Sequence, residues 1–292
     1  MRYRLAVLAA AFLFSTGGAV IKLTTLTSWE IAGLRSLAAA AVLFILLPES
    51  RRITAPRTWL AAIAYAATLV LFVLATKLTT SANAIFLQAT APLWLLMLGP
   101  PLLGERNRPR DIALGAALAA GMACSFLDPS SATSLAPRPA LGNVLAAASG
   151  LTWAVTVIAL RAASRREGGS SLPVVTAGNL LAFALSLPFL LPLEPVGRHD
   201  LLAILYLGIF QVGMAYVFLN WGMRHVPAFE SAALVLVEPA INPIWTLLLL
   251  GERPGPLTIV GGLLIVSSTL AHAVVRPRTA AAAADAAAMT PD

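Results

Sequence analysis

The stretch LLGER occurs twice in this chain of 292 residues, at residues 102–106 and again at residues 249–253. When the chain is compared with itself at this offset, residues 87–115 match residues 234–262 at ten of 29 positions without a gap. Such self-similarity at a fixed spacing indicates an internal duplication. The repeated unit is about half the chain, so the duplication predicts how the whole molecule is organised.

The composition places this duplicated chain in a lipid bilayer. Hydrophobic residues make up 59% of the chain and charged residues 11%, against about 45–50% and about 25% in soluble domains. The mean hydropathy of +0.83 agrees, and we expect an integral membrane protein. The net charge of +7 is scattered between apolar runs. This spacing argues against a nucleic-acid partner and is typical of residues that flank membrane spans.

Ten apolar runs follow one another, separated by short polar breaks. Runs of 16–22 residues suit a hydrocarbon layer roughly 30 Å thick, and a spanning helix satisfies its own backbone hydrogen bonds. We therefore expect an all-α protein with ten transmembrane helices. The runs are residues 5–21, 31–47, 59–76, 82–103, 112–127, 141–160, 172–191, 201–221, 231–250 and 257–275.

The two chain ends need separate interpretation. The first 18 residues have the basic head and apolar stretch of a secretory signal peptide, and cleavage would leave nine spans. We interpret them as the first helix, because nine spans would break the pairing of the halves. The alanine-rich segment 279–292 is expected to be a disordered tail.

The positive charges predict the orientation of the spans. With the N-terminus in the cytoplasm, fourteen of the 20 Lys and Arg residues fall on the cytoplasmic side and five on the other, while Arg35 lies inside a span. This bias predicts that both termini are cytoplasmic. Five helices per repeat is an odd number, so the second copy enters the membrane upside down. We expect inverted repeats at residues 1–138 and 139–278, an architecture common among secondary transporters.

Two longer motifs carry a family resemblance. They are TAPLWLLMLGPPLLGER in the first half and LVEPAINPIWTLLLLGERP in the second. Each half closes on a proline-containing helix followed by a Gly-Glu turn, which resembles the drug/metabolite transporter superfamily in its ten-helix EamA-type branch. Within that branch the chain is most similar to the aromatic amino-acid exporters. One departure is that the first copy has Ala91-Pro92 where the second has Glu238-Pro239.

The resemblance implies both a fold and an activity. Helices one to four and six to nine would surround a central cavity, with the fifth and tenth at the periphery, and transport would proceed by alternating access without ATP. The sequence contains no GxxxxGK[ST] phosphate-binding loop. The implied function is export of amino acids, aromatic or large and apolar ones first, across a bacterial cytoplasmic membrane. A multidrug exporter of the same fold is the alternative.

Helix nine carries the most unusual side chain for a membrane interior. Glu238 lies near mid-depth, followed by Pro239 and Pro243, while Asn242 is one turn away on the same face. A buried acid is costly and needs a reason, and prolines free backbone carbonyls. Glu238 either binds a substrate ammonium group or titrates during transport, or it locks two helices together. The sequence favours these interpretations about equally.

The equivalent face of helix four carries Gln88 and Trp94, with Pro92 between them. Gln88 can donate and accept hydrogen bonds to an amino-acid head group, or it can bond a neighbouring helix. Trp94 and Trp153 each lie twelve residues into a span, so both are expected at mid-depth. We predict that they form an aromatic wall, although ordinary packing is the better explanation for any single ring taken alone.

The remaining candidates extend this predicted site. Phe14 and Tyr65 are placed behind the two tryptophans, and Gln211 is a weaker polar candidate. Arg35 is expected either to snorkel to the headgroups or to pair with Glu30 or another acid, a structural role. Pro92, Pro239 and Pro243 are expected to shape or gate the cavity.

Other function classes find little support. No pair of catalytic groups at fixed spacing suggests an enzyme, and the single cysteine, Cys124, gives no metal-site spacing. We therefore expect no enzymatic activity, no cofactor and no metal. A small-molecule substrate and the lipid bilayer are the expected partners, and the oligomeric state is left open.

Overall fold

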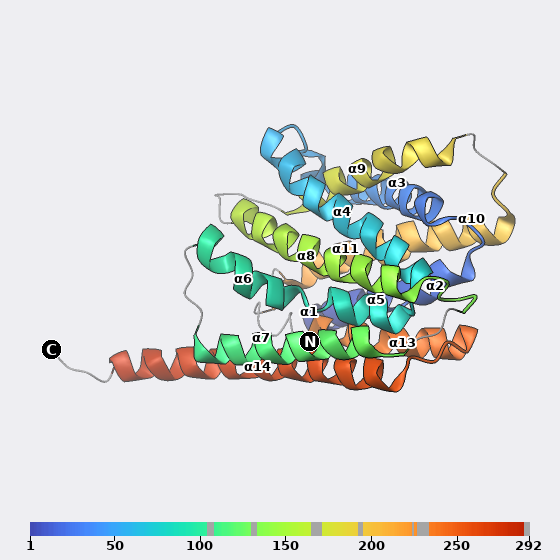
Figure 1. The fold of residues 1–292 in the computed structure, drawn as a ribbon. Coiled ribbons are helices and arrows are strands. Elements are labelled where there is room, and N and C mark those ends of the chain that lie inside the picture. Colours follow the sequence, from blue (N-terminus) through green and yellow to red (C-terminus); the bar gives the residue numbers. More distant parts are fainter. Residues whose placement is uncertain are drawn as a thin grey trace.

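The computed structural model describes residues 1–103, 108–129, 133–164, 171–191, 195–223, 225–226 and 234–288, with side chains omitted at residues 103, 160–164 and 273–288. Within these ranges the fold is helical, apart from an isolated bridge between Thr133 and Ala136. Figure 1 shows the helices running roughly side by side in one bundle.

The first half contributes α1 (Arg2–Ser15), α2 (Gly17–Leu23), α3 (Ser28–Leu46), the short 3-10 helix η1 (Pro48–Arg51), α4 (Pro56–Leu78), α5 (Ser81–Gln88), α6 (Ala91–Leu103) and α7 (Pro109–Leu127). The second half contributes α8 (Pro139–Ser164), α9 (Leu172–Leu190), α10 (Arg198–Leu205), the π-helix η2 (Tyr206–Met214), α11 (Ala215–Met223), α13 (Val237–Leu250) and α14 (Pro256–Ala288).

Several of these helices are segments of one longer span. Eight stretches are long and apolar enough to cross a membrane, three of them composed of consecutive segments: Arg2–Leu23, Ser81–Leu102 and Arg198–Met223. Two shorter apolar helices, Val237–Leu250 and Pro256–His272, follow them. The protein is thus a multi-pass, all-helical membrane protein.

Helices from the two halves pack on each other in a reciprocal pattern. The third helix of each half packs on the first helix of the other, as α4 on α8 and α1 on α11. The second helices, α3 and α9, pack on each other, and so do the fifth, α7 and α14. Figure 1 shows α7 and α14 together along one side of the bundle. Two related copies that meet across a shared axis produce this pattern.

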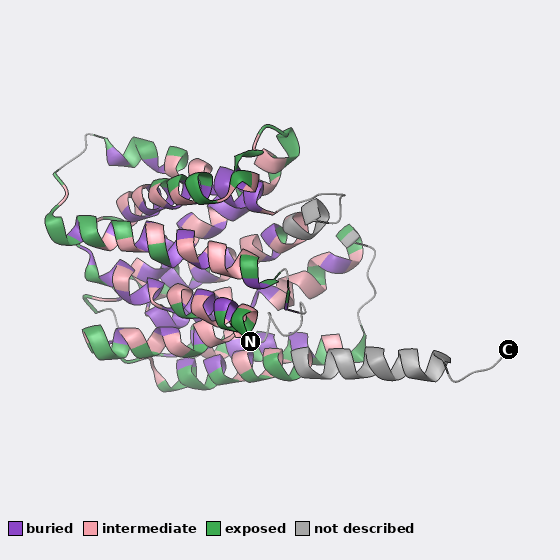
Figure 2. Cartoon of the chain, turned by 180° about the vertical axis from the view of Figure 1, so that it is seen from behind, coloured by how far each residue is buried: buried purple, intermediate pink, exposed green. Residues whose placement is uncertain are grey.

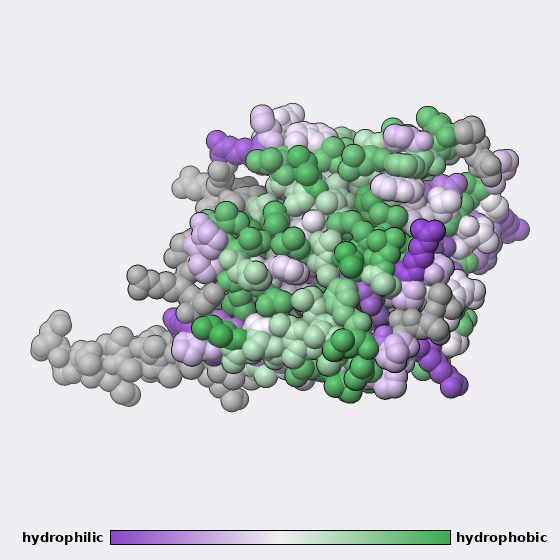
Figure 3. All heavy atoms as spheres, in the orientation of Figure 1, coloured by the Kyte–Doolittle hydropathy of each residue, from purple (hydrophilic) through white to green (hydrophobic). Residues whose placement is uncertain are grey.

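The surface matches a lipid environment. On the face in Figure 3, hydrophobic residues cover the middle of the molecule and hydrophilic residues gather toward the ends of the helices. Figure 2 shows the buried residues on the inward sides of the helices. Large apolar side chains such as Leu60, Ile63 and Leu248 are 58–72% exposed. In a membrane protein, such side chains face lipid rather than water.

Close approach of the halves depends on small residues. A methyl group added at Gly18 in α2 would overlap the Ser81 hydroxyl of α5 and lie 2.8 Å from the Asn242 side chain of α13. Glycine at this position allows the three helices to meet.

The C-terminus differs from the sequence-based expectation. α14 continues to Ala288, ten residues into the segment expected to be disordered. Alanine has the highest intrinsic helix propensity, and the alanine run explains why the helix does not end at residue 278.

Candidate functional site

Four aromatic side chains from both halves form a connected group inside the bundle, here called the aromatic cluster: Phe14, Tyr65, Trp153 and Tyr216. The Tyr65 ring lies 6.0 Å from Tyr216 and 6.5 Å from Trp153, measured between centroids. Phe14 packs edge-on against Tyr216 at 5.3 Å. The structure therefore brings together three residues that the sequence singled out, and Tyr216 links them.

Tyr65 is the most enclosed member of the aromatic cluster. It is 1% exposed and packs in an apolar group with Leu43 and Val175. A methyl group at Gly178 in α9 would overlap the Tyr65 ring, so the ring lies directly on the α9 backbone. Helices α4, α8, α9 and α11 thus converge at this ring.

Buried polar atoms without partners surround the aromatic cluster. Among the described residues, the Tyr65 hydroxyl, Asn179 Oδ1 and Thr176 Oγ1 have no hydrogen bond of standard geometry, although Asn179 and Tyr216 lie within interaction range of the Tyr65 hydroxyl. Most buried polar groups in proteins are hydrogen-bonded, so a local concentration of exceptions needs an explanation.

Arg35 belongs to this group, contrary to both sequence-based expectations. It is 2% exposed and does not snorkel. Glu30 instead caps its own helix, accepting from the Thr27 backbone N–H at 2.8 Å. The Arg35 guanidinium points into the bundle, where Nη2 donates to the Leu69 carbonyl at 3.2 Å and Nε has no partner among the described residues.

Gln211 and Glu238 lie on the second-half side of the aromatic cluster. Gln211 Nε2 donates to the Phe14 carbonyl at 3.4 Å, while its Oε1 has no partner within the described part of the chain. Glu238 is half-buried in the first turn of α13 and lies within electrostatic range of Tyr216. Arg35 lies within range of the same tyrosine, so a cation and an acid flank Tyr216.

Other predicted site residues make contacts between helices instead. Gln88 Nε2 donates to Ser149 Oγ of α8 at 2.6 Å, the interhelical arrangement that the sequence offered as the alternative. Asn242 accepts from the Ser81 hydroxyl at 2.6 Å, away from the aromatic cluster. Trp94 in α6 makes none of the ring contacts described within the cluster, and its indole nitrogen has no partner among the described residues.

The prolines interrupt their helices at equivalent places in the two halves. α5 ends at Gln88 and α6 begins at Ala91, just before Pro92. In the second half, the helical turn is broken at Leu236, and Pro239 follows in α13. Leu236 is the 147-residue equivalent of Ala89, which lies in the first break. Proline removes one backbone donor, and Pro243 lies deeper within α13.

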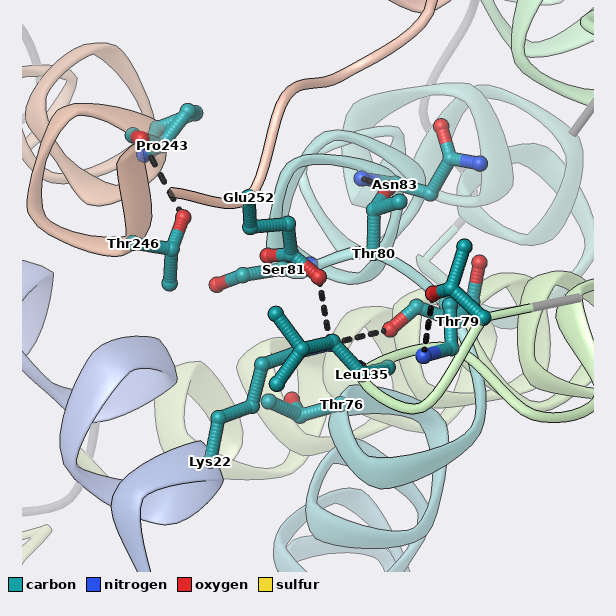
Figure 4. Close-up of polar contacts among 12 residues, drawn as sticks. Lys22, Thr76, Thr79, Thr80, Ser81, Asn83, Leu135, Pro243, Thr246 and Glu252 are labelled. Carbon is teal, nitrogen blue, oxygen red and sulfur yellow. Dashed lines mark hydrogen bonds and ion pairs between the residues drawn. The ribbon is translucent and has the colours of Figure 1, made fainter. Parts of the chain in front are cut away.

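A network of polar groups closes the bundle at one end, where α2, α5 and α13 meet. Its centre is a buried ion pair in which Lys22 Nζ lies 2.6 Å from Glu252 Oε1. Lys22 also donates to the Thr79 carbonyl at 2.8 Å and to the Leu135 carbonyl, while Glu252 Oε2 accepts from the Ser81 backbone N–H at 3.0 Å. Figure 4 shows Lys22 and Glu252 pointing toward each other. These five residues are called the polar seal.

Further hydrogen bonds join the halves around the polar seal. Asp128, after α7, accepts from the Thr258 backbone N–H of α14 at 2.7 Å. Asp200 of α10 accepts from the Thr25 backbone N–H at 3.0 Å. The acid at the centre of the seal comes from the second LLGER motif. Its first-half counterpart, in residues 104–106, lies outside the described residues.

A cavity lies at the opposite end of the bundle. It has a volume of about 320 Å³ and is lined by Leu47, Pro48, Glu49, Val217, Asn220 and Trp221, at the end of α3 remote from Thr25. Leu47 and Val217 also pack on the apolar group around Tyr65. The cavity therefore adjoins the aromatic cluster.

The sequence analysis missed Tyr216, Lys22 and Glu252. Lys22 offered one usable signal, because a lysine at the end of an apolar run next to a helix break needs an acceptor. Glu252 offered another, since it stands in the repeated motif. Within the described residues, no group of three or more His, Cys, Asp or Glu side chains is placed to hold a metal ion.

Two repeated helical units with reciprocal packing are the deciding feature for classification. The model of the EamA-like transporter family matches residues 1–127 and again residues 140–272. The chain belongs to the EamA-like transporter family. The two matches coincide with the two halves, so this EamA-like chain is a multi-pass membrane transporter built from two family repeats.

Two known proteins resemble this EamA-like transporter. An uncharacterized transporter from Archaeoglobus fulgidus is 28% identical over 204 residues, which are 66% of this chain and 67% of that protein. A protein of known crystal structure is 23% identical and superimposes with a TM-score of 0.62, covering 93% of this chain and 98% of the other. The second likeness concerns the fold alone.

Proposed function

We propose that this EamA-like protein is a secondary transporter that exports amino acids, aromatic or large and apolar ones first, across a bacterial cytoplasmic membrane. The observation that carries the proposal is the aromatic cluster, which joins both halves deep in the bundle and is flanked by Arg35 and Glu238. Rings supply apolar burial and edge-to-face contacts for a side chain. A zwitterionic head group needs both a cation and an acid beside it.

The closed and open ends suggest how transport proceeds. In the proposed topology, with ten spans and both termini in the cytoplasm, the polar seal lies on the outer side and the cavity at Trp221 on the cytoplasmic side. This conformation would then face inward, and substrate would enter from the cytoplasm. Breaking the seal and closing the cavity would release it outside, as alternating access between inverted repeats requires.

Efflux from proteoliposomes tests the proposed substrate class. The purified protein is reconstituted with internal radiolabelled phenylalanine, tryptophan, leucine or alanine, and loss of label is followed with time. We expect efflux of the three large apolar amino acids above that from protein-free vesicles, and slower efflux of alanine. Efflux of a cationic dye such as ethidium without amino-acid efflux would instead support the multidrug alternative.

Cysteine labelling tests the proposed orientation. In a Cys124→Ser background, single cysteines replace Arg253, after α13, and Arg57, in the first turn of α4; both side chains are exposed. A membrane-impermeant maleimide is expected to label Arg253→Cys in intact cells and Arg57→Cys only after permeabilisation. The opposite labelling pattern would mean that the polar seal lies on the cytoplasmic side and would contradict the proposed orientation.

A further inference from the structure

The least expected side chain in the bundle is a buried guanidinium without a counter-ion. Arg35 is 2% exposed, donates one hydrogen bond to the Leu69 carbonyl at 3.2 Å and leaves Nε unpartnered. None of the ion pairs among the described residues involves Arg35. An unpaired charge inside a membrane protein is costly and marks a functional site by default.

Polar groups of two tyrosines lie near Arg35. The hydroxyls of Tyr65 and Tyr216 lie within electrostatic range of the guanidinium, and the Tyr65 hydroxyl has no hydrogen bond of standard geometry among the described residues. Asn179 of α9 lies within interaction range of the Tyr65 hydroxyl, and its Oδ1 also has no hydrogen bond of standard geometry among the described residues. These polar groups come from α3, α4, α9 and α11.

We propose that Arg35, with the hydroxyl of Tyr65 beside it, binds the carboxylate group of the transported molecule. A guanidinium matches a carboxylate with two parallel N–H donors, and neighbouring hydroxyls occupy the remaining lone pairs. A phosphate dianion would call for several cations, whereas among the described residues Arg35 is the one cation within electrostatic range of Tyr65 and Tyr216. This inference rests on the proposed transport function and deepens it.

The position of Tyr216 indicates how an amino acid would be oriented in the site. Arg35 and Glu238 both lie within electrostatic range of Tyr216, yet no ion pair joins them among the described contacts. The carboxylate of an amino acid would lie at Arg35 and its ammonium toward Glu238, with the side chain against the aromatic cluster. The cavity lined by Leu47 and Val217 adjoins the apolar group around Tyr65, and it is the proposed route of access.

Ligands that differ only in head group test the carboxylate site without relying on transport. Thermal unfolding of the purified protein is measured with 3-phenylpropionate, which keeps the carboxylate, and with 2-phenylethylamine, which keeps only the ammonium. We expect 3-phenylpropionate to raise the melting temperature of the wild type. Arg35→Gln should weaken its apparent affinity about tenfold or more, because a buried hydrogen bond to a charged group is lost.

Three further variants keep the test informative. Tyr65→Phe removes one hydroxyl and keeps the ring, so it should weaken the affinity for 3-phenylpropionate several-fold and leave the affinity for 2-phenylethylamine unchanged. This variant keeps the test possible even if Arg35→Gln does not fold. Arg35→Lys keeps the charge without the fork and should recover only part of the affinity. Arg57→Gln, which removes an exposed arginine, is the matched control and should bind like the wild type.

The outcomes separate this inference from the proposed function. Carboxylate binding that depends on Arg35, without amino-acid efflux, would reject the proposed substrate class and keep the site. The site would be overturned if amino acids are exported and both Arg35→Gln and Tyr65→Phe bind 3-phenylpropionate with an affinity within twofold of the wild type. Stabilisation by 2-phenylethylamine and not by 3-phenylpropionate in the wild type would reject both.

Discussion

The polar seal and the aromatic cluster both bury polar side chains between the two halves, but with opposite hydrogen bonding. In the seal, Lys22 uses its three donors on Glu252 and two carbonyls, and both carboxylate oxygens of Glu252 accept. Beside the cluster, polar atoms of Arg35, Tyr65 and Asn179 have no partner among the described residues.

The difference indicates what each region is for. A fully satisfied buried network stabilises one arrangement of the helices, while a partly satisfied one costs free energy unless something else completes it. A transporter needs both, because one conformation must be held closed at one end while the substrate site stays incomplete without its ligand. Variants of the seal should therefore change stability, and variants beside the aromatic cluster should change transport.

The largest effect is expected when the ion pair of the seal is broken. Glu252→Gln leaves Lys22 buried without a counter-ion and should destabilise the conformation with the closed seal by about 3–5 kcal/mol. We expect a lower melting temperature in detergent, together with faster maleimide labelling of Thr24→Cys. Thr24 follows Lys22 by two residues and is 5% exposed while the seal is closed.

A double variant and a control complete this measurement. Lys22→Met combined with Glu252→Met should cost less than the two single changes added together, because each single change leaves the partner's charge unpaired and the double variant leaves no unpaired charge. Arg57→Gln, outside the seal, should change neither readout. Additive losses in the double variant would mean that the pair does not act as a unit.

The sequence predicted the helical spans better than the site. The repeated LLGER motif anticipated two matching units. The interruptions before Pro92 and Pro239 were not predicted, because residues 82–103 and 231–250 were each expected to form one unbroken span. Phe14, Tyr65 and Trp153 were found because mid-depth aromatic residues are few enough to single out.

Contacts between helices were harder to predict, for a physical reason. α3 is apolar nearly all round, so no stripe marks the face that it buries, and the inward direction of Arg35 was not apparent. Lys22 and Glu252 are separated by 230 residues. Their pairing depends on how α2 and α13 cross, which no local pattern specifies. The same holds for the bond between Gln88 and Ser149.

The second largest effect concerns the acid beside Tyr216. Glu238→Gln keeps the shape and removes the negative charge, so transport of zwitterionic amino acids should fall about tenfold, as for a lost hydrogen bond to a charged group. Thermal stability should change little. Reduced yield and stability with unaltered transport per folded molecule would assign Glu238 to the structural class of the seal.

A smaller and selective effect is expected for the aromatic cluster. Trp153→Ala removes a ring contact worth about 0.5–1.5 kcal/mol, so transport of tryptophan should fall several-fold more than transport of alanine in competition assays. The Trp94 ring makes none of the described contacts within the cluster, so Trp94→Ala is the matched control and should reduce the transport of both substrates equally. Equal losses for both substrates in Trp153→Ala would mean that the ring only packs helices.

The smallest effect is predicted for Gln88, for which the structure shows the interhelical hydrogen bond that the sequence had left as one of two interpretations. Its amide donates to Ser149 at 2.6 Å, so Gln88→Leu should act like loss of an interhelical hydrogen bond in a membrane protein, about 0.6 kcal/mol on average. Ser149→Ala removes the other partner and should have a similar effect, with little further loss in the double variant. Transport should keep its preference for tryptophan over alanine in all three. If Gln88→Leu alone changes this preference while its melting temperature stays at the wild-type value, then Gln88 contacts the substrate and belongs with the incomplete site.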